Sequence, residues 1–145
     1  MVSMIVVGSV IILLLLVILF ATSSQKRMMT VSVRDFRLNV EIAKTSQKRQ
    51  KGLCCRESLP ANQGMLFVYS KPGNQRFWMK DTKIPLDMFW LNEDKKVVHI
   101  ERSVQPSSYP KLFGTEIPSQ YVLETNAGFA QKHNIHVGDT ASFKL

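Results

Sequence analysis

The chain has 145 residues and a formal net charge of +8. This length fits one domain. The first 24 residues carry no charged side chain, so the remainder must supply the folded part. Nine basic residues between positions 26 and 56 are accompanied there only by Asp35 and Glu41, so this stretch holds seven of the eight net charges. Such a stretch suits anionic lipid headgroups. No nucleic-acid-binding motif accompanies it, which argues against a nucleic-acid partner.

An apolar run opens the chain. Met4 to Ala21 is interrupted only by Gly8 and Ser9, which is just long enough for a membrane-spanning helix. We predict an N-terminal transmembrane anchor over residues 1–24 and a basic juxtamembrane linker over residues 25–35. A cleaved signal peptide is the alternative, because small residues follow the run. The run is longer than the apolar part of most signal peptides, however, and no Lys or Arg precedes it.

The first predicted elements of the domain are a strand and a short helix. Apolar and polar residues alternate over residues 36–43, as in a half-buried strand. Thr45 is placed to cap a helix over residues 46–51. Residues 65–69 are continuously apolar or aromatic, which predicts a buried strand. Lys71–Asn74 has the composition of a turn.

The middle of the chain is rich in aromatic residues. We predict strands over residues 76–80 and 84–91, then a hairpin through Asn92–Asp94 into residues 97–100. Residues 104–119 contain three prolines and predict a long loop.

The C-terminal part predicts two more strands and a second helix. The strands fall at residues 121–124 and 141–144, and the helix falls near residues 127–133. Many short strands without regular strand-helix alternation indicate a mainly β domain over residues 36–145, either a β-sandwich or a barrel.

Cys54 and Cys55 are adjacent, and a disulfide between neighbours is far from ordinary bridge geometry. We therefore expect two buried thiols without a bridge, although the basic neighbours Lys51 and Arg56 keep a reactive site open. The histidines are not spaced as a ligand set beside the cysteines. We expect no metal and no cofactor.

A candidate ligand site lies in the segment from residue 76 to residue 90. Period-two alternation puts Trp78 on one face together with Arg76 and Lys80. An aromatic ring between two cations suits an anionic or sugar-like ligand. We predict one site around Trp78, with Lys80 and Asp87 as polar partners and Arg76 and Thr82 at its margin. Trp78 in a purely packing role is the alternative.

No recognised catalytic motif is present, so enzymatic activity stays open. His99 and Glu101 fall on one face of the expected hairpin, and with Asp87 they define the hydrolase or transferase alternative. An assembly factor that uses the basic stretch and the 104–119 loop to contact membrane proteins is another alternative.

An ordered series of motifs resembles domain-of-unknown-function family 192 over roughly residues 36–145. The motifs are Gly52-Leu53, Arg56, Leu59-Pro60, Gly64–Val68, Phe77–Thr82, Ile84–Asp87 and Tyr121–Glu124. Two departures stand out: Asp81 replaces the family's usual Asn, and Cys54-Cys55 replaces its usual Met-Phe.

The resemblance implies a compact β-sandwich of jelly-roll type with two short helices, commonly exported behind a signal peptide or lipid anchor. It implies no established activity. An extracytoplasmic domain follows from this resemblance, whereas the basic residues after the apolar run favour a cytoplasmic domain by the positive-inside rule. The function expected is a membrane-tethered envelope module that binds a small polar, anionic or carbohydrate-like ligand or a peptide.

Overall fold

The computed structural model describes residues 28–145. The elements in chain order are β1 (Met28–Val33), β2 (Phe36–Ala43), α2 (Ser46–Lys51), β3 (Gln63–Gly73), β4 (Leu86–Leu91), β5 (Val97–Val104), the 3-10 turn η1 (Pro106–Ser108), β6 (Ser119–Asn126), α3 (Phe129–Lys132) and β7 (Ala141–Ser142). The expected anchor over residues 1–24 lies outside the described residues. Within residues 28–145, no helix has the length and apolar character needed to cross a membrane.

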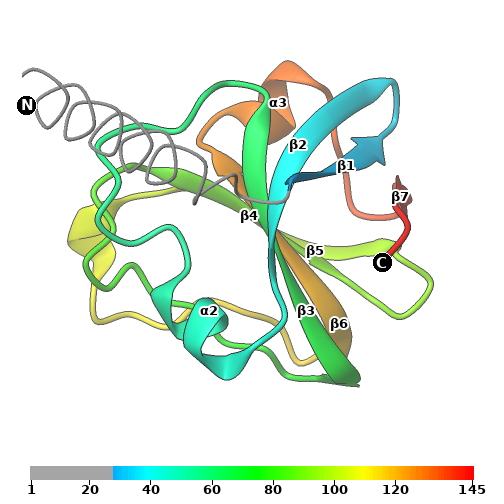
Figure 1. The fold of residues 1–145 in the computed structure, drawn as a ribbon. Coiled ribbons are helices and arrows are strands. Elements are labelled where there is room, and N and C mark those ends of the chain that lie inside the picture. Colours follow the sequence, from blue (N-terminus) through cyan, green and yellow to red (C-terminus); the bar gives the residue numbers. More distant parts are fainter. Residues whose placement is uncertain (1–27) are drawn as a thin grey trace, which may run out of the picture.

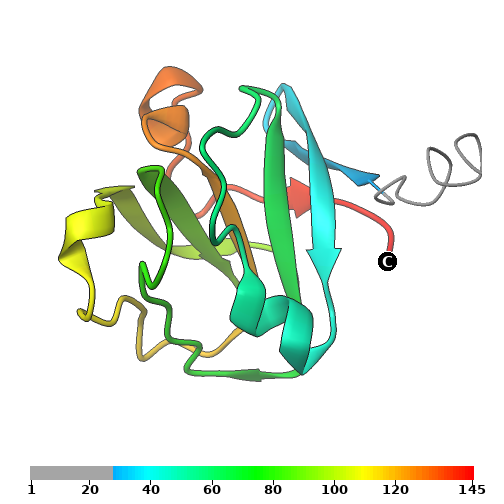
Figure 2. The ribbon, with the colours of Figure 1, turned by 60° about the vertical axis from the view of Figure 1, so that its left-hand side comes forward.

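The seven strands form one curled open sheet in the order β5-β4-β6-β3-β2-β1-β7 (Figures 1 and 2). Only β2 and β3 pair in parallel. The ends of the sheet meet where the Val97 N–H donates to Asp139 O and the Gly138 N–H donates to Val97 O, both at 2.8 Å. The mainly β class with two short helices is confirmed. A sandwich of two packed sheets, and with it the jelly roll, is replaced by a single continuous ladder that curls on itself.

Local sequence signals account for α2 and its flanks. The Thr45 hydroxyl accepts a hydrogen bond from the Lys48 N–H at 3.2 Å, which satisfies a donor at the start of the helix. Gly52 ends the helix with a φ of 51°, a conformation that favours glycine. The 36–43 strand is confirmed as β2. Figure 1 shows α2 and α3 at opposite ends of the molecule.

The central strands bury both of their faces, which explains their continuous apolar character. All six residues of β4 are buried. Phe89 belongs to a core inside the curl, to which every strand and α3 contribute. Trp90, its neighbour, belongs to a second core on the outer face, covered by the segments that connect the strands. Successive side chains along β4 or β6 therefore pack into different cores, one inside the curl and one on the outer face.

Three segments differ from expectation. Residues 71–73, expected to belong to a turn, are part of β3. Residues 28–33, predicted to belong to a linker, form β1 and pair with β2. Residues 76–80 do not form a strand: only an isolated bridge joins Phe77 to Phe113. The predicted alternation nevertheless holds, because Phe77 is buried while Trp78 and Lys80 are exposed.

Candidate functional site

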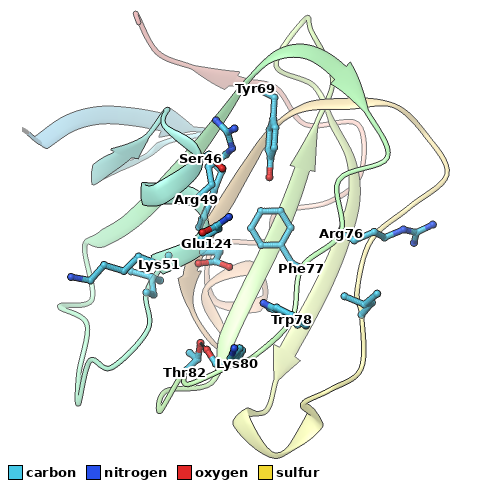
Figure 3. Close-up of a pocket in the computed structure, with 15 residues that line it drawn as sticks. Ser46, Arg49, Lys51, Tyr69, Arg76, Phe77, Trp78, Lys80, Thr82 and Glu124 are labelled. Atoms are coloured by element: carbon cyan, nitrogen blue, oxygen red, sulfur yellow. Dashed lines mark hydrogen bonds between the residues drawn. The ribbon is translucent and has the colours of Figure 1, made fainter.

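A cavity of about 340 Å³, hereafter the first cavity, opens on the outer face of the sheet. It lies among α2, β3, β6 and the segment that holds residues 76–82 (Figure 3). Aromatic, cationic and hydroxyl side chains line it together with one carboxylate; those used below are Arg49, Lys51, Phe67, Tyr69, Arg76, Phe77, Trp78, Lys80, Thr82, Leu112 and Glu124.

Four of the five predicted site residues line the first cavity: Arg76, Trp78, Lys80 and Thr82. Trp78 is 47% exposed, and its ring lies 5.8 Å from the Lys80 ammonium nitrogen. Thr82 donates its hydroxyl proton to the Lys80 carbonyl at 3.3 Å. The Arg76 side chain points away from the group and forms an ion pair with Glu116 (Figure 3). A ligand-binding role for these residues remains a prediction.

Asp87, the fifth predicted residue, lies elsewhere. Its side chain is fully buried among the residues inside the curl, and it does not line the first cavity. The two carboxylate oxygens accept the N–H groups of Ser103 at 2.7 Å and Ala130 at 2.8 Å. Asp87 thereby joins β5 to α3. These bonds account for its burial without a ligand.

Glu124 brings a buried carboxyl group to the first cavity, and it is 4% exposed. On its own face it lies between Met65 of β3 and Met88 of β4. Burial raises the pKa of Glu124 to about 8, and Arg56 partly opposes this rise. The Arg56 guanidinium itself donates through its two terminal nitrogens to the Glu41 carboxylate, at 2.6 and 2.9 Å. At neutral pH Glu124 is mostly protonated and therefore offers the cavity a hydrogen-bond donor.

Tyr69 and Arg49 form the side of the cavity next to α2. The Arg49 guanidinium lies 4.8 Å from the centre of the Tyr69 ring and donates to the Val68 carbonyl at 3.2 Å. Burial raises the pKa of Tyr69 to about 12, while Arg49 lowers it and Glu124 raises it. The Tyr69 hydroxyl points toward the middle of the group (Figure 3). The cavity thus presents two neutral donors, Tyr69 and Glu124, beside its cations.

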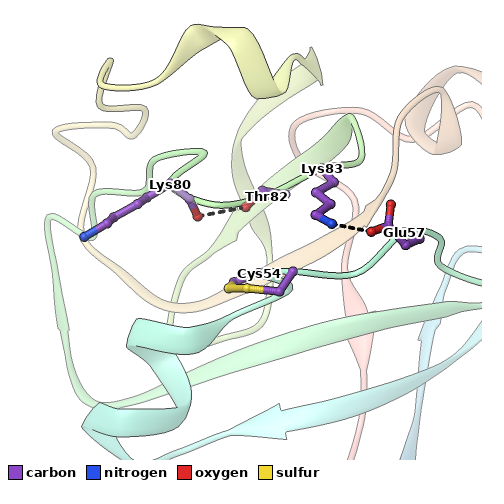
Figure 4. The surroundings of a disulfide bond; sticks show 6 residues. Cys54, Glu57, Lys80, Thr82 and Lys83 are labelled. Carbon is purple, nitrogen blue, oxygen red and sulfur yellow. Dashed lines mark hydrogen bonds and ion pairs between the residues drawn. A yellow bond between two sulfur atoms is a disulfide. The ribbon is translucent and has the colours of Figure 1, made fainter.

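Cys54 and Cys55 form a disulfide, so the expectation of unbridged thiols is wrong. The expectation of burial is also wrong: Cys54 is half-buried and Cys55 exposed. The Cys55 N–H donates to Asp81 O at 2.8 Å, which attaches the disulfide to the turn that carries Lys80 and Thr82. Figure 4 shows the disulfide between α2 and this turn. The bridge is therefore part of the frame of the first cavity.

His99 and Glu101 approach each other, with Nε2 and Oε1 3.1 Å apart. Both are half-buried, and neither is among the residues that line the first cavity. Asp87 is fully buried, and its two oxygens accept the N–H groups of Ser103 and Ala130 rather than joining this pair. Within residues 28–145, no group of three or more His, Cys, Asp and Glu side chains is arranged to hold a metal ion.

Sequence reasoning missed Arg49, Tyr69 and Glu124 as parts of the site. Glu124 ends an otherwise apolar stretch of a predicted strand. A carboxylate in such a stretch indicates a buried acidic group, and this pattern could have identified the residue. Arg49 carried no such signal, because basic residues also suit the last turn of any helix.

Comparison with known proteins adds a family. A family model described as DUF192, Uncharacterized ACR, matches residues 29–143. A solved structure from Sinorhizobium meliloti, provisionally named a transcription regulator, is 28% identical with a TM-score of 0.79, over 83% of this chain and 97% of that one. A protein of unknown function from Novosphingobium aromaticivorans is 30% identical with a TM-score of 0.78, over 83% and 89%. No curated protein matches the chain.

Proposed function

The chain belongs to the DUF192 family, and we propose that it is a binding module whose first cavity holds a small anionic, sugar-like ligand. The observation that carries the proposal is the exposed ring of Trp78 beside the Lys80 ammonium at the mouth of a cavity that has Glu124 in its wall. Large exposed aromatic rings next to a concave surface suit ligand stacking.

The charges favour an anion. Arg49, Lys51 and Lys80 line the first cavity, and Arg76 stands at its margin, whereas Glu124 is the one carboxylate among the described lining residues. Because burial raises the pKa of Glu124 to about 8, this group does not repel an anion at neutral pH. It instead donates a hydrogen bond, as a ligand hydroxyl or carboxylate requires.

The size and chemistry of the walls favour a sugar-like body for that anion. A volume of about 340 Å³ falls at the lower end of small-molecule sites. The aromatic side chains Phe67, Tyr69 and Phe77 provide apolar walls, and Tyr69 and Thr82 provide hydroxyl groups. A ring with an apolar face and several hydroxyl groups matches this combination.

We further propose that the domain is tethered to a membrane and faces the cell envelope. The uncharged apolar run over residues 4–21 supports the tether. The outward orientation rests on the resemblance described above, against the positive-inside rule. Carbonate extraction of the membrane fraction tests the tether, because an anchored chain stays in the pellet. Protease protection in intact cells tests the orientation.

Isothermal titration calorimetry of the purified full chain tests the ligand class. We expect D-glucuronate to bind more tightly than D-glucose, since only the former carries a carboxylate for Lys80. Lys80→Met should weaken glucuronate binding roughly tenfold, the scale of one charge-assisted hydrogen bond. Lys111→Met is the matched control, because its ammonium also lies over an aromatic ring, that of Phe113, but does not line the cavity. Equal affinity for the two sugars, or equal effects of the two variants, would contradict the proposal.

A second candidate function is protein assembly through the 104–119 loop. Tyr109, Leu112 and Ile117 are 46%, 56% and 51% exposed, and the Tyr109 ring lies 5.7 Å from that of Trp78. Exposed apolar side chains gathered on one loop are typical of protein contact sites. In-cell photo-crosslinking from position 112 would favour assembly if one partner dominates, and ligand binding if no adduct forms.

A further inference from the structure

A second cavity, of about 770 Å³, lies on the other side of α2. Its walls come from β1, β2, β3, α2 and the C-terminus. Only Lys51 and Gly52 line both cavities among the described residues. The two cavities are therefore separate sites that share the last turn of one short helix.

The walls of the second cavity combine apolar and cationic side chains with one side-chain carboxylate among the described lining residues, that of Glu41, to which Arg56 donates at 2.6 and 2.9 Å. Met28, Met29, Ile42, Met65 and Leu145 are apolar. Met28 and Leu145 are 36% and 54% exposed, which leaves an apolar rim open to solvent. An apolar lining that reaches an open rim suits hydrocarbon chains better than a fully hydrated ion.

Cations from separate parts of the chain converge on the same cavity. Lys44, Lys48, Lys51 and Lys144 line it, and within residues 28–145 no carboxylate lies within ion-pair distance of any of these four ammonium groups. Favourable placement at the C-terminal end of α2 explains Lys48 and Lys51 without a ligand. It does not explain Lys44, which precedes the helix, or Lys144, which comes from the opposite end of the chain.

The covalent chain limits how far this cavity can lie from a membrane. Met28 lines the cavity and lies only seven positions after Ala21, the last residue of the apolar run. A fully extended chain of that length spans at most about 25 Å. If the run crosses a bilayer, the second cavity lies within that distance of the lipid headgroups.

We propose that the second cavity binds the headgroup and upper acyl chains of an anionic phospholipid. The lysines meet the phosphate, and the methionines and Leu145 meet the hydrocarbon. The location of this site relative to the bilayer rests on the tether proposed above; its chemistry does not, because it follows from the walls of the cavity alone. The site holds the domain against the membrane surface, with the basic stretch facing the headgroups.

Methionine-methyl NMR of the full chain in detergent micelles tests the proposal, with dihexanoyl phosphatidylglycerol as the probe. Met28, Met29 and Met65 line the second cavity, whereas Met79 and Met88 are buried elsewhere and serve as internal controls. Among these five methionines, we expect the lipid to shift only the methyl signals of Met28, Met29 and Met65. Dihexanoyl phosphatidylcholine, with the same acyl chains and no net charge, should bind at least about tenfold more weakly.

Lysine variants separate specific binding from general charge. The triple variant Lys44→Gln/Lys48→Gln/Lys144→Gln should weaken phosphatidylglycerol binding at least about tenfold. Each substitution removes one cation that attracts the anionic headgroup. Lys71→Gln/Lys111→Gln/Lys132→Gln removes the same charge outside both cavities and should leave binding unchanged. Lys51 is kept in both variants because it lines both cavities.

Three results would overturn the proposal: equal binding of the two lipids, equal effects of the two triple variants, or the same methyl shifts with inorganic phosphate alone, which would indicate a site for a free anion. These results are independent of the first cavity, which none of the reporter methionines lines. They are also independent of the tether, because a chain released by carbonate extraction could still bind the lipid in micelles.

Discussion

Asp87 and Glu124 are both buried carboxyl groups on neighbouring strands, yet their surroundings differ completely. Asp87 lies inside the curl and accepts two backbone N–H groups. Glu124 lies on the outer face at the wall of the first cavity, where burial raises its pKa to about 8. Because Asp87 pairs with Thr125 and Glu124 pairs with Met88, the two carboxyl groups occupy adjacent positions of the same strand pair and differ in the face of the sheet on which they lie.

The difference separates a structural carboxylate from a candidate functional one. Dedicated donors compensate the charge of Asp87, so the fold itself explains the residue. Glu124 keeps its proton instead, and an uncharged acid at a cavity wall is available to a ligand. Each prediction below tests one side of this contrast.

The largest expected effect belongs to Asp87. Asp87→Ala leaves the N–H groups of Ser103 and Ala130 without their acceptor in a buried region. We expect the free energy of unfolding to fall by about 3 to 5 kcal/mol, measured by urea denaturation. Asp94→Ala, at an exposed turn position, is the control and should change it by less than about 0.5 kcal/mol. A small effect at Asp87 would leave its burial unexplained and reopen a functional role.

The next effect concerns Glu124 and pH. The folded-state pKa of about 8 lies above the ordinary value of 4.5, so the folded chain binds more protons than the unfolded chain between these values. The contribution of Glu124 to stability is therefore full below about pH 4.5, declines as pH rises, and is lost above about pH 8. Between these two pH values, the free energy of unfolding should fall with a slope that approaches about 1.4 kcal/mol per pH unit.

Glu124→Gln should remove this slope, because an amide does not titrate. Urea denaturation of both chains at several pH values between 5 and 9 measures the difference. Glu93→Gln, which removes an exposed carboxylate, should keep the slope. Parallel curves for the parent chain and Glu124→Gln would contradict the assignment. Glucuronate binding by the parent chain should also weaken above pH 8, since the ionised Glu124 then repels the anion.

Phe77 and Trp78 are neighbours that both line the first cavity but differ in exposure. Phe77 is 8% exposed and packs edge-on against Phe67 at a centroid distance of 4.8 Å, whereas Trp78 is 47% exposed. We expect Phe77→Ala to cost about 3 to 5 kcal/mol and Trp78→Ala less than about 1 kcal/mol, by thermal or urea denaturation. Only Trp78→Ala should abolish glucuronate binding while the fold survives. A large loss of stability for Trp78→Ala would instead assign Trp78 to packing.

The smallest expected effect is at the disulfide. Neighbouring residues close almost no loop, so the bridge restricts the unfolded chain very little. Cys54→Ser/Cys55→Ser should change the free energy of unfolding by less than about 1 kcal/mol. Alkylation of the unfolded parent chain without reductant should add no mass, and two added groups would show free thiols instead. The disulfide would then tolerate a change of a kind that Asp87 does not.

Much of the fold was predictable because local patterns report local environments. The alternation in residues 36–43, the Thr45 cap and the hairpin after Asn92 all appear where the sequence placed them. Period-two spacing also placed Phe77 and Trp78 on opposite faces, as observed, although residues 76–80 do not form the strand from which this was argued.

The remaining features depended on contacts between distant segments. β1 was missed because the basic residues around it suggested a linker, whereas pairing with β2 decides its conformation. Asp87 was grouped with Trp78 because both lie in one dense segment. Alternation along β4 sends Asp87 to the same side as Phe89, inside the curl, and Met88 to the outer face. The curl of the sheet likewise arises from the pairing of strands far apart in the chain.

Lys51 lines both cavities, and a single ammonium group cannot neutralise two anions at once. If each cavity takes an anion, occupation of one withdraws a cation from the other. The two ligands would then be antagonists, and linkage requires that each lower the affinity of the other by the same factor. Lys51, at the end of a six-residue helix, would thereby couple ligand binding in the first cavity to lipid binding in the second.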